Sequence, residues 1–205
     1  QSIGGVLVPL NTRYKGSEAA YILNASGARM LFTVGDFLGV RYPELLAGQS
    51  LPALERTVLL RGEAAGCQSW EDFLSAGDAV PAAEVARRES ELTPADTLDI
   101  LFTSGTTGNP KGVVTGHGQN IRTFETWSAT VGLQSTDNYL VINPFFHSFG
   151  YKAGWLAAII RGAHILPVLN FDLDAVLAQI ARDRISMIPG PPTIYQSLLA
   201  HPRRR

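Results

Sequence analysis

The sequence predicts an α/β fold from three observations. Short apolar runs alternate with longer amphipathic stretches along the whole chain. Several amphipathic stretches begin with a helix-capping residue followed by acidic side chains. From about residue 137 onward, strand and helix patterns alternate regularly, which predicts right-handed crossovers and a parallel sheet. The first 130 residues predict a second sheet layer.

The elements can be placed in order along the chain. Strands are expected at 4–9, 28–34, 56–60, 98–103, 111–115, 138–143, 163–168 and 185–189. Helix starts are expected at Ser17, Ser69 and Asp172, and helices at 117–130, 148–160, 172–183 and 192–200. The stretch 62–97 is rich in Ala, Glu and Gly, which predicts an exposed connection with one or two short helices. We expect one subdomain part over 1–130 and the start of a second over 131–205.

Composition narrows the class of protein. The 205 residues carry 17 basic and 18 acidic side chains, and a net charge of −1 gives no long-range attraction for nucleic acid or an anionic membrane. Cys67 is the single cysteine and cannot form an internal disulfide, which favours a reducing, cytoplasmic setting. The longest apolar stretch, 154–170, is interrupted by Arg161 and His164, so no membrane span is expected.

Two further features suggest a piece of a longer protein. Charged residues make up 17% of the chain, below the roughly 25% usual for globular domains, so either a partner covers much of the surface or the chain is a piece of a longer protein. The chain begins at Gln1 just before an apolar stretch, and it stops at Arg205 just after a helical pattern. We therefore expect a fragment.

One segment, 101–112, carries a concentration of chemistry after an apolar strand. It is dense in Gly and hydroxyl residues and contains one cation, Lys111. Backbone N–H groups, hydroxyls and a cation in one loop favour a phosphate cradle. It is not a Walker A loop, because Pro110 and Gly112 occupy positions where that motif requires Gly and Ser or Thr. For such a segment alone, a flexible glycine turn between two strands remains the alternative.

The string Phe102–Gly112 resembles the nucleotide-phosphate loop of the adenylate-forming superfamily, which contains acyl-CoA synthetases, adenylation modules of peptide synthetases and firefly-type luciferases. The strings at 9–13, 143–150 and 189–193 extend the resemblance in the same order along nearly the whole chain. The strings 145–154 and 191–199 look like actinobacterial ligases that activate propionate side chains of partly degraded sterol rings. The resemblance implies part of a large N-terminal domain with two stacked, mostly parallel sheets and helices between and outside them.

The resemblance also implies a reaction and its site. An acid–thiol ligase of this kind uses ATP, Mg²⁺ and coenzyme A to convert a carboxylic acid into an acyl-adenylate and then an acyl-CoA. Lys111 would supply a counter-charge in the adenylation step, and Thr103 would lie near the metal and phosphates. The residues expected to bind the ATP phosphates are Thr103, Ser104, Gly105, Thr106, Thr107, Gly108 and Lys111.

A second group of residues is expected to border the acyl and CoA pocket. His147 after an apolar strand is, on sequence alone, more often a packing or capping residue, but the resemblance implies a gate that positions substrate. Phe149 and Gly150 are expected to form pocket wall, because a missing side chain beside an aromatic ring leaves room for substrate. Gly190 and Pro191 are expected to line it too, although a rigid turn before a helix also explains them.

Three functions remain open at this point. The first is a fragment of an acyl-CoA ligase, with a carboxylic acid, ATP, CoA and the missing C-terminal part of its own chain as partners, and with a homodimer as an expected assembly. The second is an amino-acid adenylation module, and the third is a non-catalytic nucleotide-binding remnant. The family's metal-binding Glu, ribose-binding segment and catalytic Lys of the C-terminal lid have no counterpart here, so we expect the 205 residues alone to be inactive.

Overall fold

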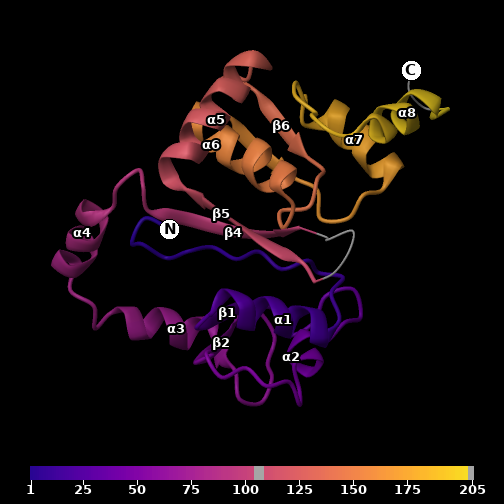
Figure 1. Cartoon of the computed structure of the whole chain (residues 1–205). Coiled ribbons are helices and arrows are strands. Elements are labelled where there is room, and N and C mark those ends of the chain that lie inside the picture. Colours follow the sequence, from indigo (N-terminus) through magenta and orange to yellow (C-terminus); the bar gives the residue numbers. More distant parts are fainter. Residues whose placement is uncertain (104–108, 203–205) are drawn as a thin grey trace. The chain divides into compact units, whose positions relative to one another are not determined.

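The computed structural model describes residues 1–103 and 109–202. The described chain forms two compact units, Gln1–Gly116 and His117–Arg205, and each is treated by itself (Figure 1). Contacts within 205 residues do not define the subdomains of a larger domain. The subdomain division expected after residue 130 therefore stays a prediction.

The first unit contains a parallel sheet and a hairpin. Strands β1 (Met30–Thr33), β2 (Arg56–Leu59) and β3 (Gln68–Ser69) pair in parallel in the order β1-β2-β3. Strands β4 (Thr97–Thr103) and β5 (Lys111–Gly116) pair antiparallel. The segment expected as a strand at 4–9 makes one bridge, in which the Leu7 N–H donates to the Leu98 carbonyl and the Leu7 carbonyl accepts from Ile100.

Helices α1 (Gly16–Ser26) and α2 (Tyr42–Leu45) complete the sheet region of the first unit. The helix start expected at Ser17 was wrong, because the N-cap is Lys15. The Lys15 N–H donates to the Glu18 carboxylate over 2.8 Å, which is the bond that the acid of a capping box makes to the N-cap backbone. Gly16 is required, since a Cβ there would lie 1.8 Å from the Leu45 carbonyl oxygen.

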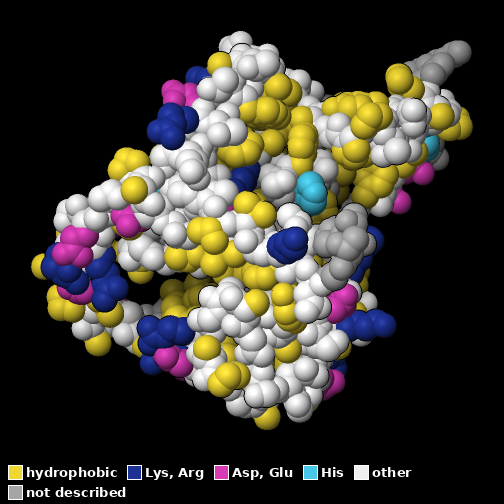
Figure 2. All heavy atoms as spheres, in the orientation of Figure 1, with side chains coloured by type: hydrophobic (Ala, Val, Ile, Leu, Met, Phe, Trp, Pro, Cys, Tyr) yellow, Lys and Arg dark blue, Asp and Glu magenta, His cyan; other side chains and the backbone are white. Residues whose placement is uncertain are grey.

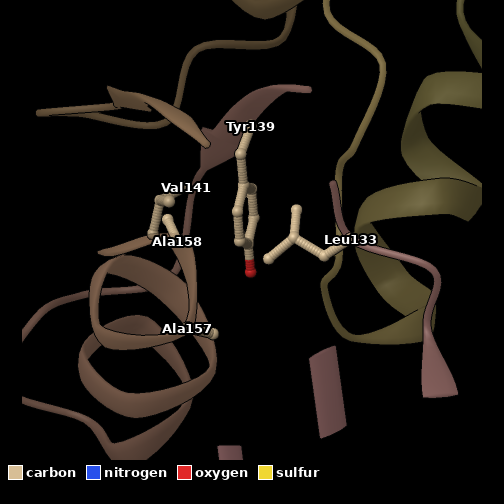
Figure 3. Packing of buried hydrophobic residues seen from close by; sticks show 5 residues of the cluster. All are labelled: Leu133, Tyr139, Val141, Ala157 and Ala158. Carbon is tan, nitrogen blue, oxygen red and sulfur yellow. The ribbon is translucent and has the colours of Figure 1, made fainter. Parts of the chain in front are cut away.

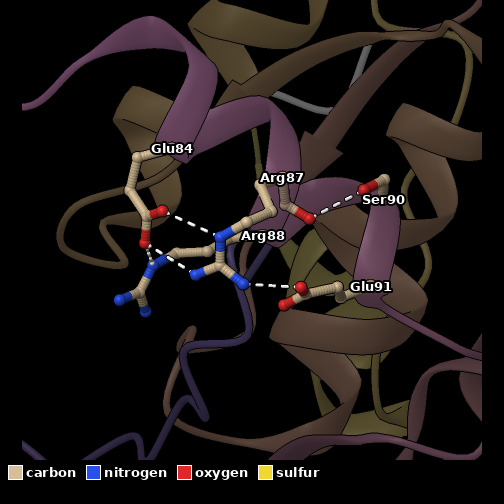
Figure 4. Close-up of polar contacts among 5 residues, drawn as sticks. All are labelled: Glu84, Arg87, Arg88, Ser90 and Glu91. Atoms are coloured by element: carbon tan, nitrogen blue, oxygen red, sulfur yellow. Dashed lines mark hydrogen bonds and ion pairs between the residues drawn. The ribbon is translucent and has the colours of Figure 1, made fainter.

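The exposed connection expected at 62–97 contains two helices, α3 (Trp70–Gly77) and α4 (Ala82–Glu91). The cap predicted at Ser69 is confirmed, since its hydroxyl accepts from the Asp72 N–H at 3.0 Å. On α4, Arg87 and Arg88 both bind the Glu84 carboxylate at 2.8 Å, and Arg87 also binds Glu91 (Figure 4). On the face shown in Figure 2, basic and acidic side chains are interspersed, in keeping with the near-zero net charge.

The second unit begins with α5 (His117–Thr130) and is built around β6 (Asn138–Val141). β6 pairs in parallel with β7 (His164–Pro167) and forms a single parallel bridge to Met187 on its other side, where a strand at 185–189 was expected. The remaining helices are α6 (Ala157–Arg161), α7 (Leu173–Arg182) and α8 (Pro192–Ala200). The cap predicted at Asp172 is confirmed by its bond to the Ala175 N–H at 2.8 Å.

Two hydrophobic clusters cover opposite faces of β6, as the alternation of side chains along a strand requires. Tyr139 and Val141 pack with Leu133, Ala157 and Ala158 (Figure 3). Leu140 and Ile142 pack with Val176 of α7 and with partly buried residues of α8. The core of the second unit therefore lies on both sides of one central strand.

The segment 148–160, where one helix was expected, contains two kinds of helix. Residues Phe149–Leu156 form a π-helix, η1, that passes directly into α6. Gly150, Tyr151, Lys152, Ala153 and Gly154 are all buried in it. Apolar periodicity alone predicts a helix here, but it does not distinguish π from α geometry.

Candidate functional site

The ends of the predicted phosphate loop are brought together by the β4–β5 hairpin. Thr103 is the last residue of β4 and pairs with Lys111, the first residue of β5. The Thr103 hydroxyl lies 3.4 Å from the Lys111 carbonyl oxygen, and both residues are exposed. Ser104, Gly105, Thr106, Thr107 and Gly108 lie outside the described residues.

Glycine and aromatic side chains shape the base of this hairpin. A Cβ on Gly112 would lie 2.9 Å from the Ile100 side chain and 3.1 Å from the Phe102 ring, so a larger residue would push the strand pair apart. The ring of Tyr21, from α1, meets Phe102 edge to face at 6.5 Å. Its hydroxyl donates to the Pro110 carbonyl over 3.2 Å. Tyr21 thus contacts the chain on both sides of the loop, a role that its position in an early helix did not predict.

His147 lies in the turn between β6 and η1, and two backbone bonds and one side-chain bond hold it in place. Its N–H donates to the Pro144 carbonyl at 3.0 Å, and its carbonyl accepts from Tyr151 at 2.9 Å. Its Nδ1 accepts from the Phe149 N–H at 3.2 Å, an arrangement that favours the tautomer with the proton on Nε2. The imidazole is exposed, so Nε2 can donate a hydrogen bond to a bound group.

Phe149 and Gly150 begin η1 beside His147. The Phe149 ring meets Trp127 of α5 edge to face, with ring centres 6.3 Å apart. Gly150 is in contact with backbone, because a Cβ there would lie 2.2 Å from the Asn143 carbonyl oxygen. The absence of a side chain at Gly150 was expected to leave room for substrate. The structure shows instead that it lets two main-chain segments pack closely.

Gly190 and Pro191 follow the segment that bridges to β6. A Cβ on Gly190 would lie 3.1 Å from the Ile194 side chain and 3.8 Å from Asn143 Oδ1. Asn143 precedes the His147 turn, so the structure brings Gly190 close to the same end of β6. Pro191 is the N-cap of α8. The structure thus gathers the predicted acyl-site residues at one edge of the second unit, whereas the phosphate-loop residues belong to the first.

Three residues of the second unit were missed by the sequence analysis. Asn143 Oδ1 is buried and has no hydrogen-bond partner among the described residues. The Tyr139 hydroxyl, whose pKa is raised by burial, donates to the Ala153 carbonyl over 2.6 Å. Lys152 is only 5% exposed within an otherwise apolar segment. A polar residue inside an apolar run was the available signal for Asn143 and Lys152.

Neither a metal cluster nor a membrane helix is found in the described part of the chain. No group of three or more His, Cys, Asp or Glu side chains is arranged to hold a metal ion. Thr103 offers one hydroxyl oxygen, which suits Mg²⁺ only if substrate phosphates and water supply the other ligands. No described helix combines the length and apolar character needed to cross a bilayer.

Comparison with known proteins identifies the family. The family model described as "AMP-binding enzyme" matches residues 1–205. The chain is 48% identical over 202 residues to a (7a-methyl-1,5-dioxo-octahydroindenyl)propanoyl:CoA ligase of Mycobacterium tuberculosis, and 42% identical over 207 residues to the ligase of the same name from Rhodococcus jostii. Each alignment covers 98% of this chain, which spans 39% and 40% of the length of those two relatives.

Solved structures agree on the fold. A long-chain-fatty-acid CoA ligase of Rhodopseudomonas palustris matches with a TM-score of 0.77 at 18% identity, over 95% of this chain and 46% of that one. The anthranilate CoA ligase AuaEII, solved with anthranoyl-AMP, matches with a TM-score of 0.75 at 26% identity, over 97% of this chain and 37% of that one. The predicted α/β fold of an N-terminal domain is confirmed, and the chain belongs to the family of AMP-binding enzymes.

Proposed function

We propose that the whole protein containing this chain is an ATP-dependent acyl-CoA ligase. The observation that carries this proposal is the likeness, at 42–48% identity over 98% of the chain, to two propanoyl:CoA ligases. A carboxylate oxygen of the acid would attack the α-phosphorus of ATP, and pyrophosphate would leave. The CoA thiol would then attack the acyl carbonyl carbon of the adenylate, with AMP as the leaving group.

The adenylation step is assigned to the phosphate loop. Negative charge accumulates on the departing pyrophosphate, and fixed donors with a cation stabilise such charge. Lys111 would supply that cation, and Thr103 would lie near Mg²⁺ and the phosphates. Ser104, Gly105, Thr106, Thr107 and Gly108 supply hydroxyl and backbone donors. The pairing of Thr103 with Lys111 across the hairpin supports this assignment, because it holds the two loop ends side by side.

The acyl and CoA site is assigned to the edge of the second unit. His147 positions the acyl and CoA groups rather than moving a proton, in keeping with its Nδ1 bond to the Phe149 N–H. Phe149, Gly150, Gly190 and Pro191 form the surrounding wall. The anthranoyl-AMP bound in the relative of 26% identity supports an adenylate as the intermediate.

The proposed acid is a propionate side chain on a fused-ring ketone. This choice follows the printed names of the two relatives at 42–48% identity. We place the whole enzyme in the cytoplasm, where ATP and CoA are available, and propose a homodimer as its assembly. The reducing setting favoured by the single cysteine, Cys67, supports the cytoplasmic placement.

The experiment is an assay of the whole protein with ATP, Mg²⁺ and a panel of acids. Pyrophosphate exchange that depends on a fused-ring keto-propionate, followed by CoA-dependent product release, supports the proposal. Exchange that depends on amino acids without CoA would indicate an adenylation module instead. Nucleotide binding without any exchange would indicate a non-catalytic remnant.

A further inference from the structure

The π-helix η1 is an unusual element in this fold. It runs for eight residues, Phe149–Leu156, whereas π geometry mostly appears as a single turn inside an α-helix and often at functional sites. Its residues include no proline. Gly150 and Gly154 loosen the backbone of η1, so a contact from outside the segment can select i→i+5 bonding over the ordinary i→i+4 pattern.

Tyr139 provides that contact. Its hydroxyl donates to the carbonyl of Ala153, in the middle of η1, over 2.6 Å. Both residues are buried, with exposures of 1% and 3%, so water does not compete for this carbonyl. A side chain inserted into the backbone hydrogen-bond ladder is a recognised cause of departure from regular α geometry.

Strand pairing on both edges of β6 holds the backbone of Tyr139 in place. Tyr139 pairs with Ile165 of β7, and on its other side it forms the bridge to Met187. The neighbouring Leu140 N–H donates to the Met187 carbonyl over 2.9 Å. Because β6 is bonded on both edges, its Tyr139 hydroxyl acts as a fixed point against which η1 is aligned.

The segment aligned in this way carries the proposed acyl site. Phe149 is its first residue, and the Tyr151 N–H donates to the His147 carbonyl over 2.9 Å. A return from i→i+5 to i→i+4 bonding would change which residues of η1 face β6. It would therefore change how Phe149, two residues after His147, meets the ring of Trp127.

We propose that Tyr139 is a positioning residue of the acyl site, which acts by holding η1 in its π form. The proposal rests on the proposed function for the site itself, but the restraint on η1 does not. Tyr139 touches no substrate and takes no part in proton transfer. Its effect is transmitted through the Ala153 carbonyl to the backbone that carries Phe149 and follows His147.

The test replaces Tyr139 in the whole protein with three side chains of similar size. Tyr139→Phe removes the donor, and Tyr139→4-fluorophenylalanine removes it while filling the space of the hydroxyl. Tyr139→4-aminophenylalanine keeps a donor at the same ring position and should restore wild-type behaviour. If Tyr139→Phe does not fold, the fluoro and amino variants still form a matched pair. Tyr42→Phe is the control, since it loses a hydroxyl-to-carbonyl bond of 2.8 Å to Thr12 in the first unit.

Two readouts are expected to change together. Trp155 lies within η1 and stacks on Tyr151 with ring centres 4.8 Å apart, so the tryptophan bands of the near-UV circular dichroism spectrum, to which the replaced ring at 139 does not contribute, report the form of the segment. We expect this signal to change in the Phe and fluoro variants. In the same variants we expect the KM for the acid or for CoA to rise about five-fold, the factor for one ordinary hydrogen bond, with the KM for ATP unchanged.

The outcomes separate the two proposals. Unchanged near-UV spectra and KM values in the fluoro variant would overturn the role of Tyr139. A changed spectrum with unchanged KM values would also overturn it, because η1 would then move without consequence for the site. A whole protein without CoA ligase activity would instead overturn the proposed function, and the spectra alone would decide whether Tyr139 restrains η1.

Discussion

Gly150→Ala gives the sharpest test of the packing at the candidate acyl site. A Cβ at this position would lie 2.2 Å from the Asn143 carbonyl oxygen, 2.3 Å from the Pro144 carbonyl oxygen and 2.7 Å from the Pro144 carbonyl carbon. Ordinary contact begins near 3.4 Å, so the two backbone segments would have to separate by about 1.2 Å. No side-chain rotation can relieve the clash, because all three atoms belong to the main chain.

The two segments have little freedom to move apart. The Pro144 carbonyl already accepts from the His147 N–H at 3.0 Å, and η1 is bonded to Tyr139. Overpacking in a buried site costs about 1–3 kcal/mol and occasionally more. Ala gains about 1 kcal/mol of helix propensity over Gly, which does not offset a backbone clash. We therefore expect Gly150→Ala to lower the free energy of unfolding by about 3 kcal/mol.

Urea denaturation of the chain, followed by tryptophan fluorescence, measures this change. Gly77→Ala is the matched control, because it lies in α3 with no atom within 4 Å of its Cβ position. The control should be neutral or stabilising by up to about 1 kcal/mol. A loss below about 1 kcal/mol in Gly150→Ala would refute the argument, since the backbone would then have room that the structure denies it.

Three further predictions concern the loop, the gate and the α4 surface. Lys111→Ala in the whole protein should slow pyrophosphate exchange about 10- to 150-fold, because a charge-assisted contact contributes about 1.5–3 kcal/mol; unchanged exchange would exclude that role. His147→Ala should raise the KM for the acid or CoA, and a loss confined to ATP affinity would contradict the gate. Hydrogen bonds from Arg87, and then from the neighbouring arginine, lower the pKa of Glu84 to about 2. Stability linked to Glu84 should therefore be present above its usual pKa and be lost as the pH falls towards 2, and NMR titration should show this midpoint rising in Arg87→Gln.

Features set by local sequence were predicted well. The helix starts at Ser69 and Asp172 depend on a side chain that reaches a backbone N–H three residues ahead, so nothing distant is needed. The strands around 30, 57, 100, 113, 140 and 165 appear where apolar runs indicated them. Within the exposed connection at 62–97, α3 begins at the Ser69 cap, whereas α4 follows Pro81 and has no side-chain cap bond.

Features set by distant contacts were not predicted. The segments 4–9 and 185–189, where strands were expected, each form a single bridge to a neighbouring strand. The π form of η1 depends on a hydroxyl from β6, ten or more residues earlier, and no periodicity within 148–160 can indicate it. The N-cap at Lys15 was missed because lysine is not among the usual N-cap residues, and the Glu18 carboxylate binds its backbone N–H from inside the helix.

The same difference between local sequence and distant contacts applies to the candidate site. The substrate contacts that the sequence motif indicates stay predictions, and the structure shows that two of those residues, Thr103 and Lys111, pair across the hairpin. The motif did not indicate the residues that support the site from other elements. Tyr21 contacts both ends of the loop from α1, and Tyr139 reaches η1 from a neighbouring strand. Such supports carry no motif, because their role depends on position in space and not on spacing along the chain.

The topology of the second unit gives an independent reason to place a site beside His147. After β6 the chain enters η1 and α6, which pack on the face of Tyr139 and Val141. After the bridge at Met187 it enters α8, which packs on the opposite face with Leu140. Two adjacent parallel segments therefore send their following chain to opposite sides of the sheet. In open α/β sheets, ligands bind outside the carboxyl ends of strands at such a point. His147 and Gly190 follow those two ends, so the geometry of the sheet selects the same edge as the sequence motifs without using any residue of the motifs.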